Sequence, residues 1–150
     1  MTLHSAPDKE EQASERAWHL GGANRARWRP DGVLEVVLGD ERHSEGLIYD
    51  EQDGRDALEL VTGLIGDRQN VHLLVDIRGL SRTSAGARRI PSHPEVCCLA
   101  FWVSGPVGRM LGNAYLGIVK PEHPTRLFSE EALAITWLKS QGHLTQRTLP

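Results

Sequence analysis

Two hydroxyl side chains and three arginines lie close together in the middle of the sequence. In the segment "LLVDIRGLSRTSAGARRI" these side chains are Thr83, Ser84, Arg82, Arg88 and Arg89. A serine or threonine that begins a helix is a common N-cap, because its oxygen accepts a hydrogen bond from a free backbone N–H. The same hydroxyl could carry a phosphate, which a helix N-terminus and nearby arginines would stabilise. The pattern therefore predicts a helix start first, and a phosphoacceptor or anion surface at Ser84 or Thr83 second.

A second group of side chains could line an apolar pocket between a sheet and its helices. Its members are Trp102, Met110, Leu111, Tyr115 and Trp137. Methionine and aromatic residues at helical spacing usually pack in a core, so packing is the simpler interpretation. A cavity on the order of a few hundred Å³ would instead favour binding of an apolar small molecule or lipid.

The residue patterns of common catalytic and metal sites are absent. The sequence has no phosphate-binding loop and no G-x-S-x-G motif, and its seven histidines are scattered. Cys97 and Cys98 are adjacent, and neighbours on a strand point to opposite faces, so we interpret them as small core residues. We therefore expect no enzyme, no cofactor and no metal. An enzyme built from dispersed residues such as His93, Glu122 and His123 is a third and weaker hypothesis.

Composition and charge exclude several classes of partner. The chain has 150 residues and a net charge of −3, so no strong positive field attracts nucleic acid or an anionic membrane. The longest apolar run, "VCCLAFWV", is too short to cross a bilayer. The N-terminus lacks the features of a signal peptide, so we expect a cytoplasmic protein. The alternating Arg25, Arg27 and Arg29 are interpreted as the exposed face of an edge strand rather than a nucleic-acid surface.

The elements that must position these residues follow from hydrophobic periodicity. Residues 1–20 are polar and acidic and predict a flexible tail with a short helix over 9–17, and residues 21–150 predict one α/β domain. An antiparallel hairpin turns at "PDG", and alternating helices and strands then predict parallel neighbours. We expect a single small domain with a mixed, mostly parallel sheet of about five strands flanked by about four helices. The expected elements after the hairpin are a helix over 50–66, a strand over 71–77, a helix from about 84, a strand over 96–103, a helix from 104, a strand over 125–128 and a helix from 129 to 139–142.

This order of elements resembles the STAS domain, the fold of anti-sigma-factor antagonists, over residues 22–142. The strand "LLVDIRGL", the run "SAGARR" and above all "PTRLFSEEALAITWL" also resemble uncharacterised bacterial proteins described as STAS-like or CRAL-TRIO-like. The resemblance implies a non-enzymatic, cytoplasmic regulatory module of bacteria that binds a protein partner. Such a partner would be a kinase or an anti-sigma-type regulator, and a homodimer is a further expectation.

The resemblance also implies a role for one serine. In STAS antagonists an Asp-Ser-Ser-Gly tetrad follows a strand, and its first serine is phosphorylated. With a one-residue deletion, "TSAG" falls on this tetrad, so that Ser84 lies on the phosphoacceptor. Thr83 replaces the aspartate of the tetrad and Ala85 replaces its second serine. The partner surface would then comprise residues 80–89 and the start of the helix at Ser104.

Overall fold

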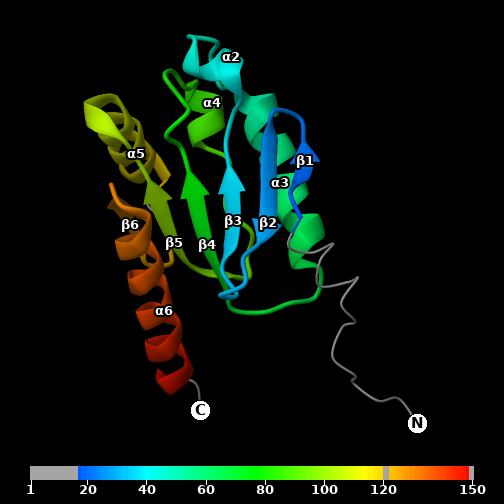
Figure 1. The fold of residues 1–150 in the computed structure, drawn as a ribbon, viewed down its shortest axis with the longest axis vertical. Helices are drawn as coiled ribbons and strands as arrows, with labels where there is room; N and C mark the ends of the chain where they lie inside the picture. Colours follow the sequence, from blue (N-terminus) through cyan, green and yellow to red (C-terminus); the bar gives the residue numbers. More distant parts are fainter. Residues whose placement is uncertain (1–16, 120–121, 149–150) are drawn as a thin grey trace.

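A computed structural model describes residues 17–119 and 122–148, and includes no side-chain detail for 117–119 and 142–148. Its centre is a six-stranded sheet in which the spatial order of the strands, β1 to β6, equals their order in the sequence (Figure 1). This is the mixed α/β fold that the sequence predicts. The elements are β1 His19–Gly21, β2 Asn24–Trp28, β3 Leu34–Val37, α2 Glu41–Ser44, α3 Glu51–Ile65, β4 Val71–Asp76, α4 Ala85–Arg88, β5 Val96–Trp102, α5 Gly105–Val119, β6 Thr125–Phe128 and α6 Glu131–Thr148.

The N-terminal strands are antiparallel, and the remaining pairs from β3 to β6 are parallel. At the predicted hairpin turn, the Asp31 carboxylate accepts a hydrogen bond from the Val33 N–H at 3.1 Å. Gly32 has a φ of +87°, a backbone conformation that glycine adopts without strain. The turn chemistry in the sequence therefore sets the register of β2 and β3.

Three predictions are wrong, and they concern the extent of the N-terminal tail, the edge strand of the sheet and the end of the last helix. The strand β1 begins at His19, inside the predicted tail, and it pairs with β2, so β2 is not an edge strand. The arginines of β2 are also partnered: Arg27 donates to Glu35 at 3.2 Å and stacks on the Trp18 ring. At the other end, α6 continues through Gly142 to Thr148 rather than ending between 139 and 142. The helix expected over 9–17 lies almost wholly outside the described residues.

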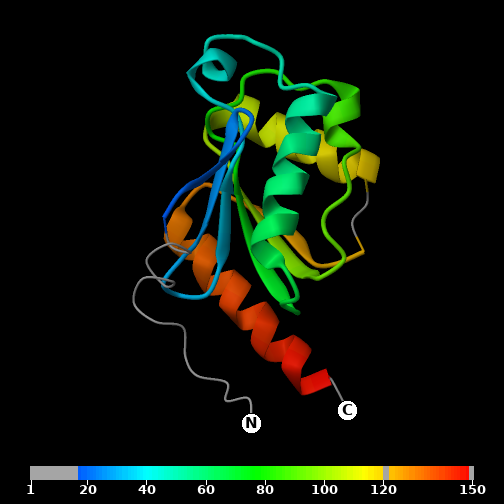
Figure 2. The same cartoon turned by 90° about the vertical axis from the view of Figure 1, so that its right-hand side faces the viewer.

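The helices cover the two faces of the sheet unequally. Figure 2 shows α6 on one face, whereas α3 lies on the other face. One apolar cluster joins the sheet to α3, α4 and α5, and includes Val61, Leu111 and the partly buried Ala87. A second cluster packs Ala134 and Leu138 of α6 against Leu74 of β4. The sheet is therefore buried on both faces, as continuous apolar strands predict.

A β-bulge interrupts the pairing of β4 with β5. Val71 lies opposite Val96, but the next residue, His72, lies opposite Cys98, so Cys97 is the extra residue on β5. Cys97 and Cys98 both pack with the α6 cluster. The expectation that the two cysteines point to opposite faces is therefore wrong, because a bulge breaks the strict alternation of side chains.

No helix within the described ranges is both long enough and apolar enough to cross a membrane.

Candidate functional site

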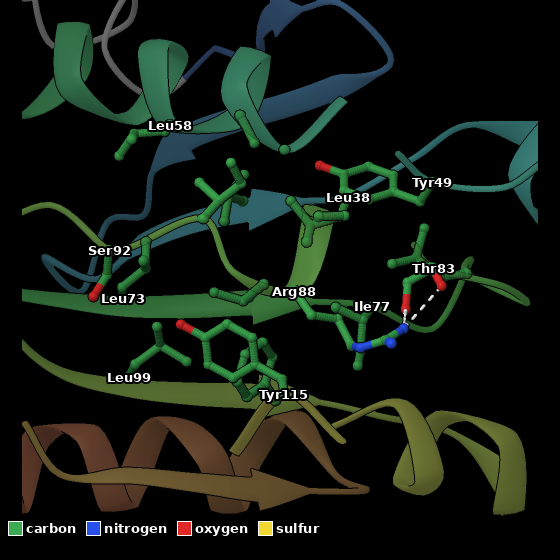
Figure 3. Close-up of a pocket in the computed structure, with 18 of the residues that line it drawn as sticks. Leu38, Tyr49, Leu58, Leu73, Ile77, Thr83, Arg88, Ser92, Leu99 and Tyr115 are labelled. Carbon is green, nitrogen blue, oxygen red and sulfur yellow. Dashed lines mark hydrogen bonds between the residues drawn. The ribbon is translucent and has the colours of Figure 1, made fainter. Parts of the chain in front are cut away.

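A cavity of about 130 Å³ lies between the sheet and the helices α3, α4 and α5 (Figure 3). Its walls are mainly aliphatic and aromatic side chains of both layers. Members of this lining include Val61 of α3, Ala87 of α4, Leu111 and Tyr115 of α5, and Leu73 and Phe101 of the sheet. A few polar side chains interrupt the apolar surface, and these are Tyr49, Thr83, Arg88, Ser92 and His93. An apolar cavity with a few polar groups is the usual composition of a small-molecule site.

Arg88 is the cationic residue of this lining. Its Nη1 donates to the carbonyl oxygen and to the Oγ1 of Thr83, both at 2.8 Å, as Figure 3 shows. Its Nε is buried and has no hydrogen-bond partner, and it is the one side-chain atom of this kind in the described part of the chain. No hydrogen bond from Nη2, and no ion pair with a carboxylate, is formed within the described residues. The Nε–Nη2 edge of the guanidinium is therefore unused.

The Nε–Nη2 edge of Arg88 is unusual because its Nε is a buried donor without an acceptor. A buried donor without an acceptor costs about 1–3 kcal/mol, more for a charged group. An arginine prefers to place two parallel N–H donors against one carboxylate or phosphate. The edge formed by Nε and Nη2 of Arg88 has this fork geometry, so it could bind a carboxylate.

Tyr49 connects the cavity to a buried polar cluster. Its hydroxyl donates to Asn24 Oδ1 at 2.6 Å and also lies 3.0 Å from the carbonyl oxygen of Asp53. The fully buried His43 extends the cluster, because its Nε2 lies 3.1 Å from Asp53 Oδ2. Burial, followed by the charge of Asp53, raises the pKa of Tyr49, so this side chain remains a neutral donor.

The backbone of Tyr49 holds the segment that leads into α4. Its N–H donates to the Arg82 carbonyl, and its carbonyl accepts from the Ser84 N–H, both at 2.9 Å. An isolated bridge pairs Tyr49 with Thr83 in parallel. The wall that carries Arg88 is therefore fixed through Tyr49 to the rest of the fold.

The predicted helix start at Ser84 is correct. Ser84 is the N-cap of α4, and its Oγ accepts a hydrogen bond from the Ala87 N–H at 3.0 Å. Thr83 Oγ1 instead accepts from Arg88. Arg82, Arg89 and Ser104 are exposed. Of the four residues predicted for a partner or anion surface, three are therefore on the exposed surface. The fourth, Arg88, is half-buried and lines the cavity.

Of the five residues predicted for an apolar pocket, Leu111 and Tyr115 line the cavity. The other three lie elsewhere. Trp102 and Trp137 pack in the α6 cluster on the opposite face, and Met110 is 62% exposed. Met110 and Leu111 are adjacent in α5, so the helical periodicity of the sequence placed both on the apolar side. In the structure only Leu111 faces the sheet.

Sequence analysis missed Tyr49 and did not foresee that Arg88 is half-buried in the cavity lining. Tyr49 lies in a short loop before α3, where no periodic pattern marks it. The sequence signal for Arg88 was its position four residues after the Ser84 N-cap, one turn into the helix, next to the apolar Ala87 and Ile90. That spacing allows the Arg88 side chain to point either toward the sheet or toward solvent.

Comparisons with known proteins give a family and a fold. The model of a family described as "Domain of unknown function (DUF7793)" matches residues 44–141. The chain is similar to the crystal structure of an uncharacterised DUF3478-family protein with a SpoIIAA-like fold from Shewanella loihica PV-4. The TM-score is 0.52 and the identity 15%, over 80% of this chain and 96% of that chain. This likeness confirms the predicted STAS-like fold.

A second solved structure is a protein of unknown function from Arthrobacter sp. FB24. It is 31% identical over 75% of this chain and 90% of that chain, with a TM-score of 0.28. A comparison with curated proteins finds no match.

The Tyr49 hydrogen bonds generate a prediction about stability. Tyr49→Phe removes the hydroxyl and leaves Asn24 Oδ1 with only the 3.3 Å bond from the Gly39 N–H. We expect the free energy of unfolding to fall by about 1–3 kcal/mol, as for other buried groups that lose a partner. Urea titration followed by circular dichroism measures this change.

The matched control is Tyr115→Phe in the same cavity. The Tyr115 hydroxyl makes no hydrogen bond to any residue that the structure describes, so we expect a change within about 0.5 kcal/mol. Equal losses for the two variants would contradict the role assigned to Tyr49.

The Ser84 cap generates a second prediction. Ser84→Ala removes the acceptor for the Ala87 N–H and should lower the free energy of unfolding by about 1 kcal/mol. Ser84→Asp should retain most of this stability, because aspartate is an equally good N-cap. A Ser84→Ala variant as stable as the wild type in the same urea titration would show that the cap has no energetic weight.

Proposed function

The chain belongs to the DUF7793 family, and we propose that it is a non-enzymatic, SpoIIAA-like module that binds a small amphipathic acid beneath α4. The apolar walls of the cavity hold the body of the ligand, and Arg88 binds its acidic head. The observation that carries this proposal is that Arg88, a residue of the cavity lining, has a buried Nε without a hydrogen-bond acceptor.

The volume of the cavity limits the size of the ligand. An engineered apolar cavity of about 150 Å³ in another protein stays dry and binds benzene. The cavity here, at about 130 Å³, has a similar volume, although it is smaller than the few hundred Å³ expected of a typical ligand pocket. The apolar body of the ligand is therefore about as large as one aromatic ring or a short aliphatic chain.

The chemistry of Arg88 determines the head group. Thr83 occupies only Nη1, so a carboxylate can accept two parallel hydrogen bonds from Nε and Nη2. Hydrogen bonds to charged groups contribute about 1.5–3 kcal/mol, which corresponds to roughly 10–150-fold in affinity. An acid should therefore bind more tightly than a neutral molecule of the same shape.

Among the described residues that line the cavity, Ser92 forms a serine–histidine pair with His123. Ser92 lines the cavity, and its Oγ lies 2.8 Å from His123 Nε2. A serine nucleophile also needs a group that stabilises the imidazolium, usually a carboxylate on Nδ1. His123 Nδ1 instead lies 3.1 Å from the hydroxyl of Thr125. This neutral partner supports a binding role for Ser92 rather than a catalytic one.

A protein partner on the outer side of α4 is the second candidate function. The observation that favours it is that Ser84 caps the same short helix that carries Arg88 into the cavity and the exposed Arg89 out of it. A kinase or an anti-sigma-type regulator that recognises Arg82, Arg89 and Ser104 would then respond to modification of Ser84. Phosphate on Ser84 in protein isolated from its native cells, detected by intact-mass spectrometry, would support this function.

Substitution of Arg88 tests the acid-binding proposal. We use phenylacetate as the probe and 2-phenylethanol as its neutral counterpart, with binding measured by isothermal titration calorimetry. Arg88→Met retains side-chain length but removes every donor, so the affinity for phenylacetate should fall by about 10–100-fold. The affinity for 2-phenylethanol should stay within a few-fold of that of the wild type.

The matched control is Arg89→Met, which removes the same charge from the exposed neighbouring position. This variant should bind phenylacetate as the wild type does. If both substitutions weaken phenylacetate binding equally, the loss comes from the overall charge of the protein and not from a contact with Arg88. If the wild type binds the acid and the alcohol equally well, the site does not recognise an acidic head group. If the wild type binds neither probe, the ligand-binding function itself is wrong.

The non-enzymatic proposal is tested with p-nitrophenyl acetate, a small activated ester. We expect hydrolysis no faster than that by Ser92→Ala at equal concentration, because the Ser92–His123 pair lacks a carboxylate. A burst of p-nitrophenol that disappears in Ser92→Ala would show covalent catalysis and overturn the proposal.

A further inference from the structure

Three side-chain atoms that could bind a metal ion, one nitrogen and two sulfurs, converge at the start of β4 and β5. His72, Cys97 and Cys98 each offer one ligand atom, and these atoms lie within 4.8 Å of one another. The two sulfur atoms are 4.0 Å apart. The cysteines pack in the α6 cluster, so this group is separated by the sheet from the cavity that Arg88 lines.

The β-bulge is what brings the group together. In a regular pairing only one of two successive cysteines faces the same side as a given neighbour on β4. Here Cys97 is the extra residue, and Cys98 is the register partner of His72. Both sulfur atoms therefore lie on the same face of the sheet as His72. Bulges redirect side chains, and they occur often beside functional sites.

The separation of the two sulfur atoms is close to that in a zinc site. Zn–S bonds of about 2.3 Å in a tetrahedral site place two sulfur ligands roughly 3.8 Å apart. The observed 4.0 Å between the sulfur atoms differs from this separation by only a few tenths of an ångström. Imidazole lies roughly 3.5 Å from sulfur in such sites, and the three ligand atoms here all lie within 4.8 Å of one another.

The partial exposure of Cys97 and His72 favours a role as metal ligands over a role in core packing. Cys98 is fully buried, whereas Cys97 and His72 are half-buried, which leaves a path for an ion. Packing explains Cys98 well. It does not explain why a half-buried histidine and a second cysteine converge on the same point.

We propose that His72, Cys97 and Cys98 bind one Zn²⁺ ion. Two thiolates and one imidazole are ligands that zinc prefers, and three protein ligands leave the fourth position to water. Binding of the ion would link β4 to β5 where the bulge interrupts their pairing. The proposal is independent of the acid-binding function, because it uses other residues on the other face of the sheet.

The experiment uses the untagged full chain, reduced and treated with a chelator, and then titrated with Co²⁺ as a spectroscopic substitute for zinc. We expect one equivalent to give a sulfur-to-cobalt charge-transfer band and strong visible bands of tetrahedral cobalt. One equivalent of Zn²⁺ should then abolish these bands. Cys97→Ser and His72→Asn should each weaken binding by at least about tenfold, because even changes beyond the ligands have effects of 10–100-fold.

The matched control is His93→Gln, which removes another half-buried histidine outside the group. This variant should bind cobalt as the wild type does, and circular dichroism should show that all variants are folded. Absence of the charge-transfer band in the wild type would overturn the proposal. Full binding by both Cys97→Ser and His72→Asn would overturn it as well.

Discussion

The hydrogen bond from the Tyr49 hydroxyl to Asn24 is the interaction on which the candidate site depends. It joins a loop on the cavity side of the sheet to β2, at 2.6 Å and away from water. The same residue holds the Arg82–Ser84 segment through backbone hydrogen bonds. The short α4 has only four residues, too few to be stable by itself, so its position relies on this attachment. The orientation of Arg88 toward the cavity relies on it in turn.

Arg88 and the cavity together represent a loss of stability that a packed core would avoid. Filling the space with aliphatic groups and replacing the arginine would remove both an empty volume and an unsatisfied donor. Proteins tolerate such local defects where a function requires them, and they cluster at binding sites. The described part of the chain pairs its other buried side-chain donors, including those of Asn24 and Tyr49. The exception at Arg88 is therefore specific to the cavity.

Local sequence patterns predicted most of the fold and less of the site. The strand at 125–128 and the Ser84 cap agree with the structure, because proline boundaries and helix caps act within a few residues. The three-residue β1 was missed, since "HLG" has no alternation from which to recognise a strand. The bulge at Cys97 was missed for another reason: register between strands depends on how distant segments meet. The inward direction of Arg88 likewise depends on the packing of α4 against α3 and α5.

The strand order of the sheet has a consequence for synthesis of the chain. Each strand from β2 to β6 pairs with the strand that precedes it in the sequence. During translation, every strand that leaves the ribosome therefore finds its neighbour already made, and none must wait for a later segment or insert between two earlier ones. The N-terminal part of a chain becomes available for folding first during synthesis. The sheet can then be extended one strand at a time, with β6 and α6 completing the fold last.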